Sequence, residues 1–233
     1  VLHIAVESGK PVILVSLTGS AMALSWEDEH IPAILQAWYP GAQGGHAVAR
    51  VLFGESCPEG KLPVTFYRTA EELPEFTDYS MQGRTYRYMK QDALYPFGYG
   101  LSYTRFEQGK AEVSKESIEA GGCVKLRVSV KNTGMMAGGQ TVQVYVKALR
   151  EGTPNPQLKG LKKVFLQPGG ETQVCISLPD TAFALYDEDG RRMLEAGEYA
   201  VYVGMQQPDE RSAILMGQRP EKIAITCAQT VQL

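Results

Sequence analysis

The sequence predicts a partial parallel α/β layer followed by an all-β, antiparallel sandwich. Apolar side chains occur in continuous runs or every three to four residues in the first part, and at every second residue in the second part. Residues 1–104 hold 7 Lys and Arg against 11 Asp and Glu, whereas residues 105–233 hold 16 against 15. This shift in composition predicts two domains, residues 1–104 and 105–233.

The first residues read as the end of a helix. Residues 2–6 are mostly apolar, and Ser8, Gly9 and Lys10 follow them, so Gly9 is the expected helix stop. Val1 is not a methionine, and the helix has no visible start. We therefore expect the chain to be a fragment of a longer protein.

Strands and helices are expected to follow in the first part. The run Val12–Val15 between Pro11 and Gly19 is typical of a parallel strand buried on both faces. Apolar residues then recur at helical spacing over residues 31–38. A second helix is expected over His46–Phe53, ending at Gly54, and Val64–Phe66 is expected to close the unit as a strand.

From Val124 onward the hydrophobic period is two. Alternating runs occur over Val124–Val130, Val142–Val146, Val174–Leu178 and Tyr199–Val203, and glycine-rich turns separate them. Short strands at this spacing predict an antiparallel β-sandwich of about seven strands.

An aromatic segment, residues 67–103, joins the two parts. It contains seven tyrosines, with arginines and glycines among them. Long ordered loops either carry function or hold domains together. Aromatic rings stack on sugar rings while charged groups bind hydroxyls, so Asp78, Arg84, Tyr86 and Tyr88 are the candidate substrate-binding residues. The alternative is that they pack the sandwich against the α/β layer.

Several classes of function are excluded by composition and by missing motifs. The net charge of −3 provides no basic surface for nucleic acid, and no apolar run is long enough to span a membrane. Motifs for a serine nucleophile, a phosphate-binding loop and a zinc protease are absent. The glycines of Gly41–Gly45 predict a tight turn, and the acids Glu27–Glu29 suit a helix start better than catalysis. No metal or cofactor is expected.

The four cysteines, Cys57, Cys123, Cys175 and Cys227, lie about fifty residues apart without metal-binding spacing. We expect reduced, mostly buried thiols, with a single Cys123–Cys175 bridge left open. The lack of a disulfide pattern slightly favours the cytoplasm and leaves a secreted or periplasmic location open.

Seven long motifs run through the chain. In the first part they are GKPVILVSLTGSAMALSW (Gly9–Trp26), AILQAWYPGAQGGHAVARVLFGESCPEGKLPVTF (Ala33–Phe66), GRTYRYM (Gly83–Met89) and LYPFGYGLSYTRF (Leu94–Phe106), and in the second part they are VKNTGMMAGGQTVQVYV (Val130–Val146), LKGLKKVFLQPGG (Leu158–Gly170) and EAGEYAVYVG (Glu195–Gly204). The first four closely resemble the C-terminal region of glycoside hydrolase family 3. The last three resemble the fibronectin type III-like domain of that family, which implies an immunoglobulin/fibronectin III-like sandwich.

The resemblance implies a retaining β-glycosidase that acts on terminal β-D-xylosyl or β-D-glucosyl residues of plant oligosaccharides. The segment Asp78–Met89 is similar to the β-xylosidase branch, with β-glucosides as the rival substrate. Retaining hydrolysis needs two carboxyl groups about 5 Å apart. In the family these precede the region matched here, so no catalytic residue has a matching position in this chain.

The resemblance also implies partners. They are a β-linked glycoside substrate and the N-terminal barrel region of the same protein, and a homo-oligomer stays open. The alternative is a non-catalytic module that binds carbohydrate or protein. An incomplete parallel layer would also expose apolar side chains around Val12–Val15, so we expect the chain to need its missing region or a partner.

Overall fold

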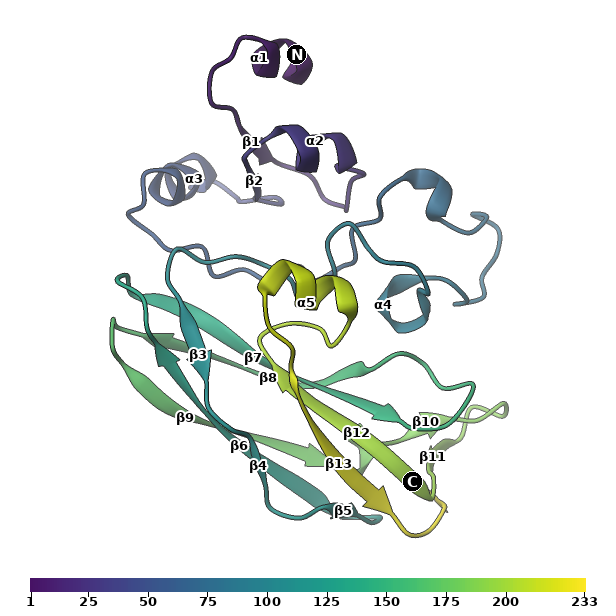
Figure 1. Cartoon of the computed structure of the whole chain (residues 1–233). Helices are drawn as coiled ribbons and strands as arrows, with labels where there is room; N and C mark the ends of the chain where they lie inside the picture. The colour runs from purple at the N-terminus through teal and green to yellow at the C-terminus, as the bar shows by residue number, and fades with distance from the viewer.

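A two-stranded parallel sheet organises the first part of the chain. The computed structural model describes all residues, 1–233, and Figure 1 shows the helices of this part around the sheet. In chain order the elements are α1 (Leu2–Glu7), β1 (Ile13–Ser16), α2 (Ser25–His30), β2 (Ala33–Gln36) and α3 (Gly44–Leu52). Ile13 pairs with Ala33 and Ser16 with Gln36. The α/β class and the helix near residues 46–53 are therefore confirmed.

The helix expected over residues 31–38 was wrong. Residues 33–36 form β2, and Trp38 follows with φ of 53°, a left-handed conformation that no right-handed helix contains. The apolar run is too short for its spacing to separate a helix from a buried strand. The strand expected at Val64–Phe66 is reduced to one antiparallel bridge between Phe66 and Tyr95.

The parallel sheet is only partly covered. Leu24, Phe66 and Leu94 form its small buried core. Ile13 is 51% exposed, and Leu17 is 57% exposed. Apolar side chains on and beside β1 thus face solvent, as expected for an incomplete layer.

The aromatic segment contains two short helices and long ordered loops. They are η1 (Ala70–Glu72) and α4 (Thr85–Tyr88). Figure 1 shows these loops between the parallel sheet and the sandwich.

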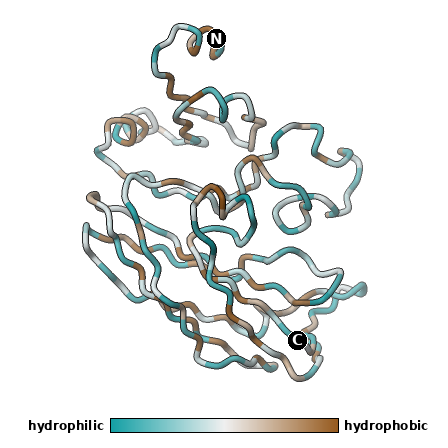
Figure 2. The backbone as a smooth tube through the Cα atoms, viewed as in Figure 1, coloured by the Kyte–Doolittle hydropathy of each residue, from teal (hydrophilic) through white to brown (hydrophobic).

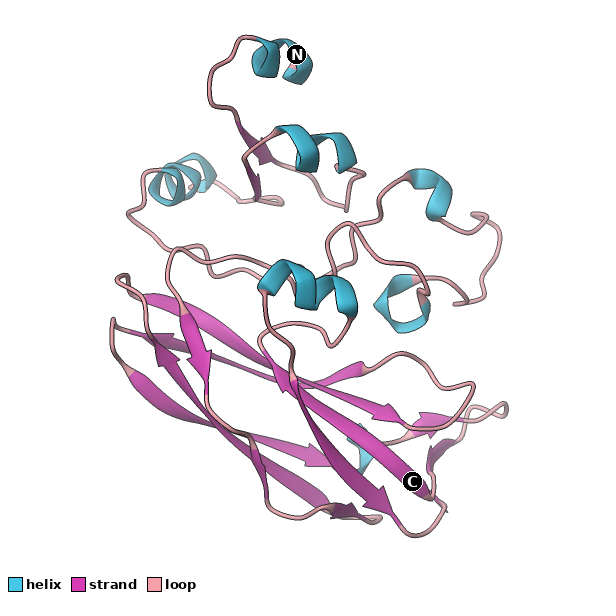
Figure 3. Ribbon diagram, viewed as in Figure 1, coloured by secondary structure: helices cyan, strands magenta, loops and turns pink.

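Two main sheets form the second part, as Figure 3 shows, and their strands pair antiparallel except for the parallel pair β5 and β13. One has the strand order β5-β13-β12-β7-β8, and the other has β6 at its centre, paired with β3, β4 and β9. A small sheet of β10, β11 and β14 lies at one end. The bounds are β3 (Phe106–Gln108), β4 (Glu112–Val113), β5 (Ser117–Ile118), β6 (Cys123–Asn132), β7 (Gly138–Ala148), β8 (Gln157–Leu166), β9 (Glu171–Pro179), η2 (Asp180–Ala182), β10 (Leu185–Tyr186), β11 (Arg192–Leu194), β12 (Gly197–Gly204), β13 (Glu221–Cys227) and β14 (Val231–Gln232).

Alternating side chains fill the sandwich core, which contains 23 buried hydrophobic residues. On β6, Val124, Leu126, Val128 and Val130 point inward and the residues between them are charged or polar. Figure 2 shows the resulting change between brown and teal along the strands. The period-two pattern therefore predicted the inward face of this strand correctly.

Helix α5 (Glu210–Met216) connects β12 to β13 and faces the first part of the chain (Figure 1). The Asp209 carboxylate caps it by accepting a hydrogen bond from the Ser212 amide at 2.9 Å. Gly217, at φ of 66°, ends it in the left-handed conformation.

All four cysteines are free thiols, and only Cys227 is buried. The expectation of mostly buried thiols was therefore wrong. Cys123 pairs with Pro179 across β6 and β9, whereas Cys175 pairs with Arg127, so the two thiols are not adjacent. No helix here has the length and apolar character of a membrane span.

Candidate functional site

Arg84 fixes the exposed turn that carries Asp78. Its Nη2 donates to the carbonyl oxygens of Glu75 at 2.8 Å and of Asp78 at 2.7 Å. The Asp78 Oδ1 accepts from the Ser80 amide at 2.8 Å. That amide, then the Ser80 hydroxyl and the Arg84 charge, lower the pKa of the Asp78 carboxyl. Asp78 and Arg84 thus lie together on one ordered turn.

The same turn presents aromatic side chains to solvent. Phe76 is 93% exposed, and Tyr79 is 91% exposed. Their faces have no aromatic partner within the chain. Exposed rings on an ordered loop can stack on a sugar or on a neighbouring polypeptide.

Thr85 begins α4 in a strained conformation. Its φ is 55°, which is unusual for a β-branched residue. The Tyr67 hydroxyl accepts a hydrogen bond from the Thr85 amide at 2.8 Å. Such strain persists only where surrounding contacts impose it, and here the strained residue orients α4 with Tyr86 and Tyr88.

Tyr86 joins the aromatic segment to the sandwich. Its ring stacks on Phe97 with centroids 4.3 Å apart and meets the edge of Tyr145 at 6.2 Å. Its hydroxyl accepts from the Leu158 amide at 3.2 Å, and its carbonyl accepts from Asn155 Nδ2 at 3.0 Å. These contacts favour the interface role for Tyr86. Tyr88 is half-buried on the same helix.

Gly98 allows a second close contact between the segment and the sandwich. Gln143, which is 3% exposed, donates through Nε2 to the Gly98 carbonyl at 2.9 Å and to the Met205 carbonyl at 3.1 Å. Tyr145 donates to Gln143 Oε1 at 2.7 Å. Gly98 has φ of 79°, and a Cβ there would collide with Gln143 Oε1.

Charged side chains also cross the boundary. Glu59 accepts from the Gly139 amide at 2.9 Å and pairs with Lys163 at 2.7 Å. Within the first part, Asp28, one of the acids at the start of α2, accepts a hydrogen bond from the Tyr95 hydroxyl of the aromatic segment at 2.5 Å. Sequence reasoning missed these contacts because the partners are 67 or more residues apart and share no motif.

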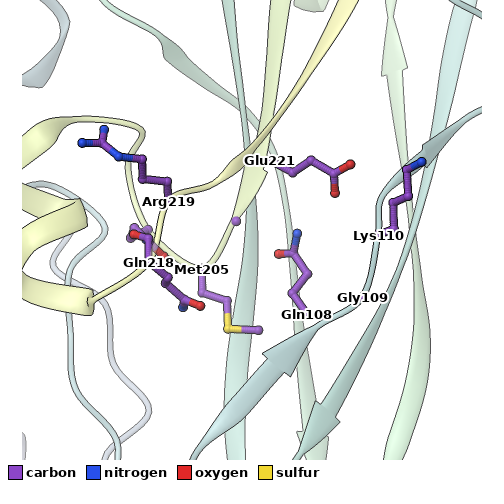
Figure 4. A pocket seen from close by; sticks show the side chains of 9 residues that line it. Gln108, Gly109, Lys110, Met205, Gln218, Arg219 and Glu221 are labelled. Carbon is purple, nitrogen blue, oxygen red and sulfur yellow. The ribbon is translucent and has the colours of Figure 1, made fainter.

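Of two cavities, one lies within the sandwich part and the other between the sandwich and the aromatic segment. The larger, about 390 Å³, lies beside β3, β12 and β13 and has a mostly polar lining. Figure 4 shows Gln108 directed toward Glu221, whereas the Arg219 guanidinium points away. Arg219 pairs with Glu210, and Glu221 accepts from the Ala111 amide at 2.7 Å. The first pair holds α5 to the loop after it, and the second bond joins the start of β13 to the segment between β3 and β4.

The second cavity, about 200 Å³, lies under α4 and is bordered by Tyr86, Met89 and Asp209. No group of three or more His, Cys, Asp or Glu side chains is arranged to hold a metal ion. The contacts along the boundary are hydrogen bonds, aromatic stacking and the Glu59–Lys163 ion pair.

A parallel α/β layer joined through an aromatic segment to a fibronectin-like sandwich defines a two-domain class of protein. Residues 1–103 match the glycosyl hydrolase family 3 C-terminal domain, and residues 140–207 match the fibronectin type III-like domain. The chain therefore belongs to glycoside hydrolase family 3, and its recognition from sequence is confirmed.

Named relatives agree with this assignment. A xylan 1,4-beta-xylosidase of Xylanibacter ruminicola is 43% identical over 205 residues, which cover 87% of this chain and 24% of the relative. A periplasmic beta-glucosidase of Salmonella typhimurium is 35% identical over 212 residues, which cover 85% of this chain and 28% of the relative. The chain therefore spans about a quarter of the length of these relatives.

Solved structures share the fold of the whole chain. Beta-glucosidase 3B from Thermotoga neapolitana, in complex with alpha-D-glucose, gives a TM-score of 0.84 at 30% identity over 97% of this chain and 32% of that one. A beta-glucosidase from Kluyveromyces marxianus gives a TM-score of 0.83 at 31% identity, and the match covers 99% of this chain and 28% of that one. The chain is thus similar to the C-terminal part of larger beta-glycosidases.

Proposed function

We propose that this chain is the C-terminal part of a retaining β-glycosidase that removes terminal β-D-xylosyl or β-D-glucosyl residues from plant oligosaccharides. The observation that carries the proposal is the order of the two matched domains, together with 43% identity to a xylan 1,4-beta-xylosidase. That relative, and the similarity of Asp78–Met89 to the xylosidase branch, favour xylosides over glucosides.

The catalytic nucleophile and acid/base are proposed to lie outside this chain. Two carboxyl groups about 5 Å apart are needed for retention. The densest acidic group, Glu27–Glu29, lies in α2, where Asp28 is bonded to Tyr95. The contribution of this chain is then to support the catalytic region and to shape the substrate site. The N-terminal barrel region is its proposed partner, facing the exposed apolar side chains of β1.

The domain boundary is proposed at residues 104 and 105. The Thr104 hydroxyl donates to Asn132 Oδ1 of the sandwich at 2.7 Å, and Phe106 begins β3. As substrate contacts, Asp78, Arg84, Tyr86 and Tyr88 stay a prediction. The exposed turn supports that role for Asp78 and Arg84, whereas the packing of Tyr86 supports the interface role.

Hydrolysis of aryl β-xyloside and aryl β-glucoside tests the proposal. The 233-residue chain is assayed alone and after addition of the polypeptide encoded upstream. We expect no activity alone and activity on reconstitution, with the faster substrate identifying the sugar. Hydrolysis by the chain alone would contradict the proposed location of the carboxyl groups.

The second candidate function is a non-catalytic module that binds carbohydrate or protein. The exposed Phe76 and Tyr79 rings favour it. It predicts that this chain alone binds a glycan or a protein, and titration calorimetry that finds no glycan binding would contradict its carbohydrate form.

A further inference from the structure

Three segments that are distant in sequence enclose the cavity of about 200 Å³. They are the part of the aromatic segment around residues 86–96, Asn155 and Pro156 just before β8, and residues 207–209 before α5. Thr65 closes the cavity from the α/β side.

Two residues that line this cavity each carry a buried polar atom without a hydrogen-bond partner. Thr65 is 7% exposed and Gln207 is 9% exposed, and both line the cavity. The Thr65 Oγ1 and Gln207 Oε1 atoms are buried without a donor or acceptor in the chain. An unpaired buried polar atom destabilises the folded chain, so a ligand that pairs with both atoms, once a small side-chain rotation exposes them to the cavity, would recover that free energy.

The remaining polar groups of the lining are mostly acceptors. Asn155 uses Nδ2 to donate to the carbonyls of Tyr86 and Met89, which leaves its side-chain carbonyl oxygen for a ligand. Asp92 and Asp209 add carboxylates, and Lys90 adds an ammonium donor. Burial, together with the charge of Asp92, raises the pKa of Asp209.

The other walls are apolar. Tyr86, Met89 and three prolines line the same space. This mixture requires a ligand with several hydroxyl donors and with apolar CH groups. A bare cation does not fit well, because its oxygen ligands lie at about 2.0–2.6 Å, whereas this cavity is wide and includes an ammonium group. Its volume is below the roughly 300–1,000 Å³ typical for drug-sized ligands, which suits one small ring.

We propose that this cavity binds a single sugar ring, an aldopentose or aldohexose, whose hydroxyls donate to Gln207 Oε1 and to the carboxylates and pair with Thr65 Oγ1. This inference goes beyond the proposed function, and it rests on the cavity alone. Binding is measured without hydrolysis, so its failure and a failure of the glycosidase assignment are separate results.

Titration of the 233-residue chain with D-xylose and with D-glucose, followed by amide NMR shifts, tests the proposal. We expect shifts at Gln91, Ala93 and Asn155 and none around Gln108 in the larger cavity. Shifts confined to other residues, or no saturable shifts for either sugar, would overturn the proposal. This result in the unmodified chain does not depend on the folding of any variant.

Variants of nearly unchanged side-chain shape then test whether these two buried atoms bind the sugar, rather than the general polarity of the cavity. Thr65→Val removes the hydroxyl at nearly unchanged volume, and Gln207→Leu removes the amide oxygen. Each is expected to weaken sugar binding about tenfold, corresponding to about 1.4 kcal/mol. The matched control is Gln206→Leu, because Gln206 is 1% exposed and lines the other cavity.

Unchanged affinity in a folded Thr65→Val chain, or equal weakening in Gln206→Leu, would contradict the proposed contacts. A titration with calcium chloride forms a separate arm. Calcium shifts at Asp92 and Asp209 without sugar shifts would overturn the sugar assignment in favour of a cation.

Discussion

The Tyr95 hydroxyl donates a 2.5 Å hydrogen bond to Asp28 Oδ1 and so connects the aromatic segment to α2. Arg211 of α5 lies 3.9 Å from the other oxygen of Asp28 and donates to the Leu94 carbonyl at 3.2 Å. Burial and the Asp28 contact raise the pKa of Tyr95, which therefore stays a neutral donor. Three elements of the chain thus meet at one carboxylate.

Removal of the Tyr95 hydroxyl should destabilise the chain. Tyr95→Phe keeps the ring and deletes a hydrogen bond to a charged acceptor, so we expect a loss of about 1–2 kcal/mol in unfolding free energy. Urea unfolding followed by circular dichroism measures it. Tyr79→Phe is the control, since Tyr79 is 91% exposed; equal losses in both variants would contradict a specific role for the Tyr95–Asp28 bond.

The sandwich could be predicted from the sequence because its strands have one buried face. That burial forces the alternation of residues such as Val124 and Leu126 on β6, and alternation is visible without knowledge of the partner strand. The short apolar run that forms β2 has no such pattern, because none of its four residues is fully buried and so few positions do not separate a strand period from a helical one; it was assigned to a helix.

The site was harder to predict than the fold. Arg84 and Asp78 are close in sequence, and the structure places them on one turn. The contacts of Tyr86 with Leu158 and of Gln143 with Gly98 join residues 45 or more positions apart. No local pattern marks such pairs, so composition alone could not separate a sugar site from an interface.

Alanine at Gly98 should destabilise the chain through two effects. The left-handed φ of 79° costs about 1–2 kcal/mol for a residue with a Cβ. The new Cβ would also displace Gln143 Oε1 from the Tyr145 hydroxyl. We expect a total loss of about 3 kcal/mol, measured by urea unfolding.

The control for Gly98 is Gly152→Ala. Gly152 has φ of 77°, and a Cβ there meets nothing within 4 Å. Gly152→Ala therefore measures the backbone effect alone, and we expect it to lower the unfolding free energy by about 1 kcal/mol. Equal losses at both positions would show that the contact with Gln143 adds nothing.

The buried Lys61 ammonium should make stability rise with pH. Its Nζ donates to the Gly100 carbonyl at 2.6 Å, yet burial lowers its pKa from 10.5 to about 8. Between these values the unfolded chain binds more protons than the folded chain, so unfolding free energy increases from about pH 8 to 10.5. This contribution is lost as pH falls toward 8.

The change Lys61→Met tests that dependence. Wild-type stability should rise relative to the variant between pH 8 and pH 10, by at most about 1.4 kcal/mol per pH unit. The exposed Lys125→Met is the matched control. If the unfolding free energies of the wild type and Lys61→Met change with pH in parallel, the titration of Lys61 contributes nothing to stability.

Alanine variants of Tyr86 and Arg84 should distinguish a role in the domain interface from a role in substrate binding. Tyr86→Ala removes a ring stacked on Phe97 and an acceptor for the Leu158 amide, so we expect a loss of about 2–3 kcal/mol in unfolding free energy. Arg84→Ala removes two hydrogen bonds on an exposed turn and should cost about 1 kcal/mol or less. Thermal unfolding of the 233-residue chain measures both.

The kinetic half of this test uses the reconstituted enzyme. If the Asp78–Arg84 turn contacts substrate, Arg84→Ala should raise KM or lower kcat on aryl β-xyloside while the melting temperature hardly changes. Arg84→Lys retains the charge but loses the paired donor geometry that holds Glu75 and Asp78, so it should recover only part of the loss. Normal kinetics in Arg84→Ala, combined with a large melting shift, would assign the whole aromatic segment to the interface.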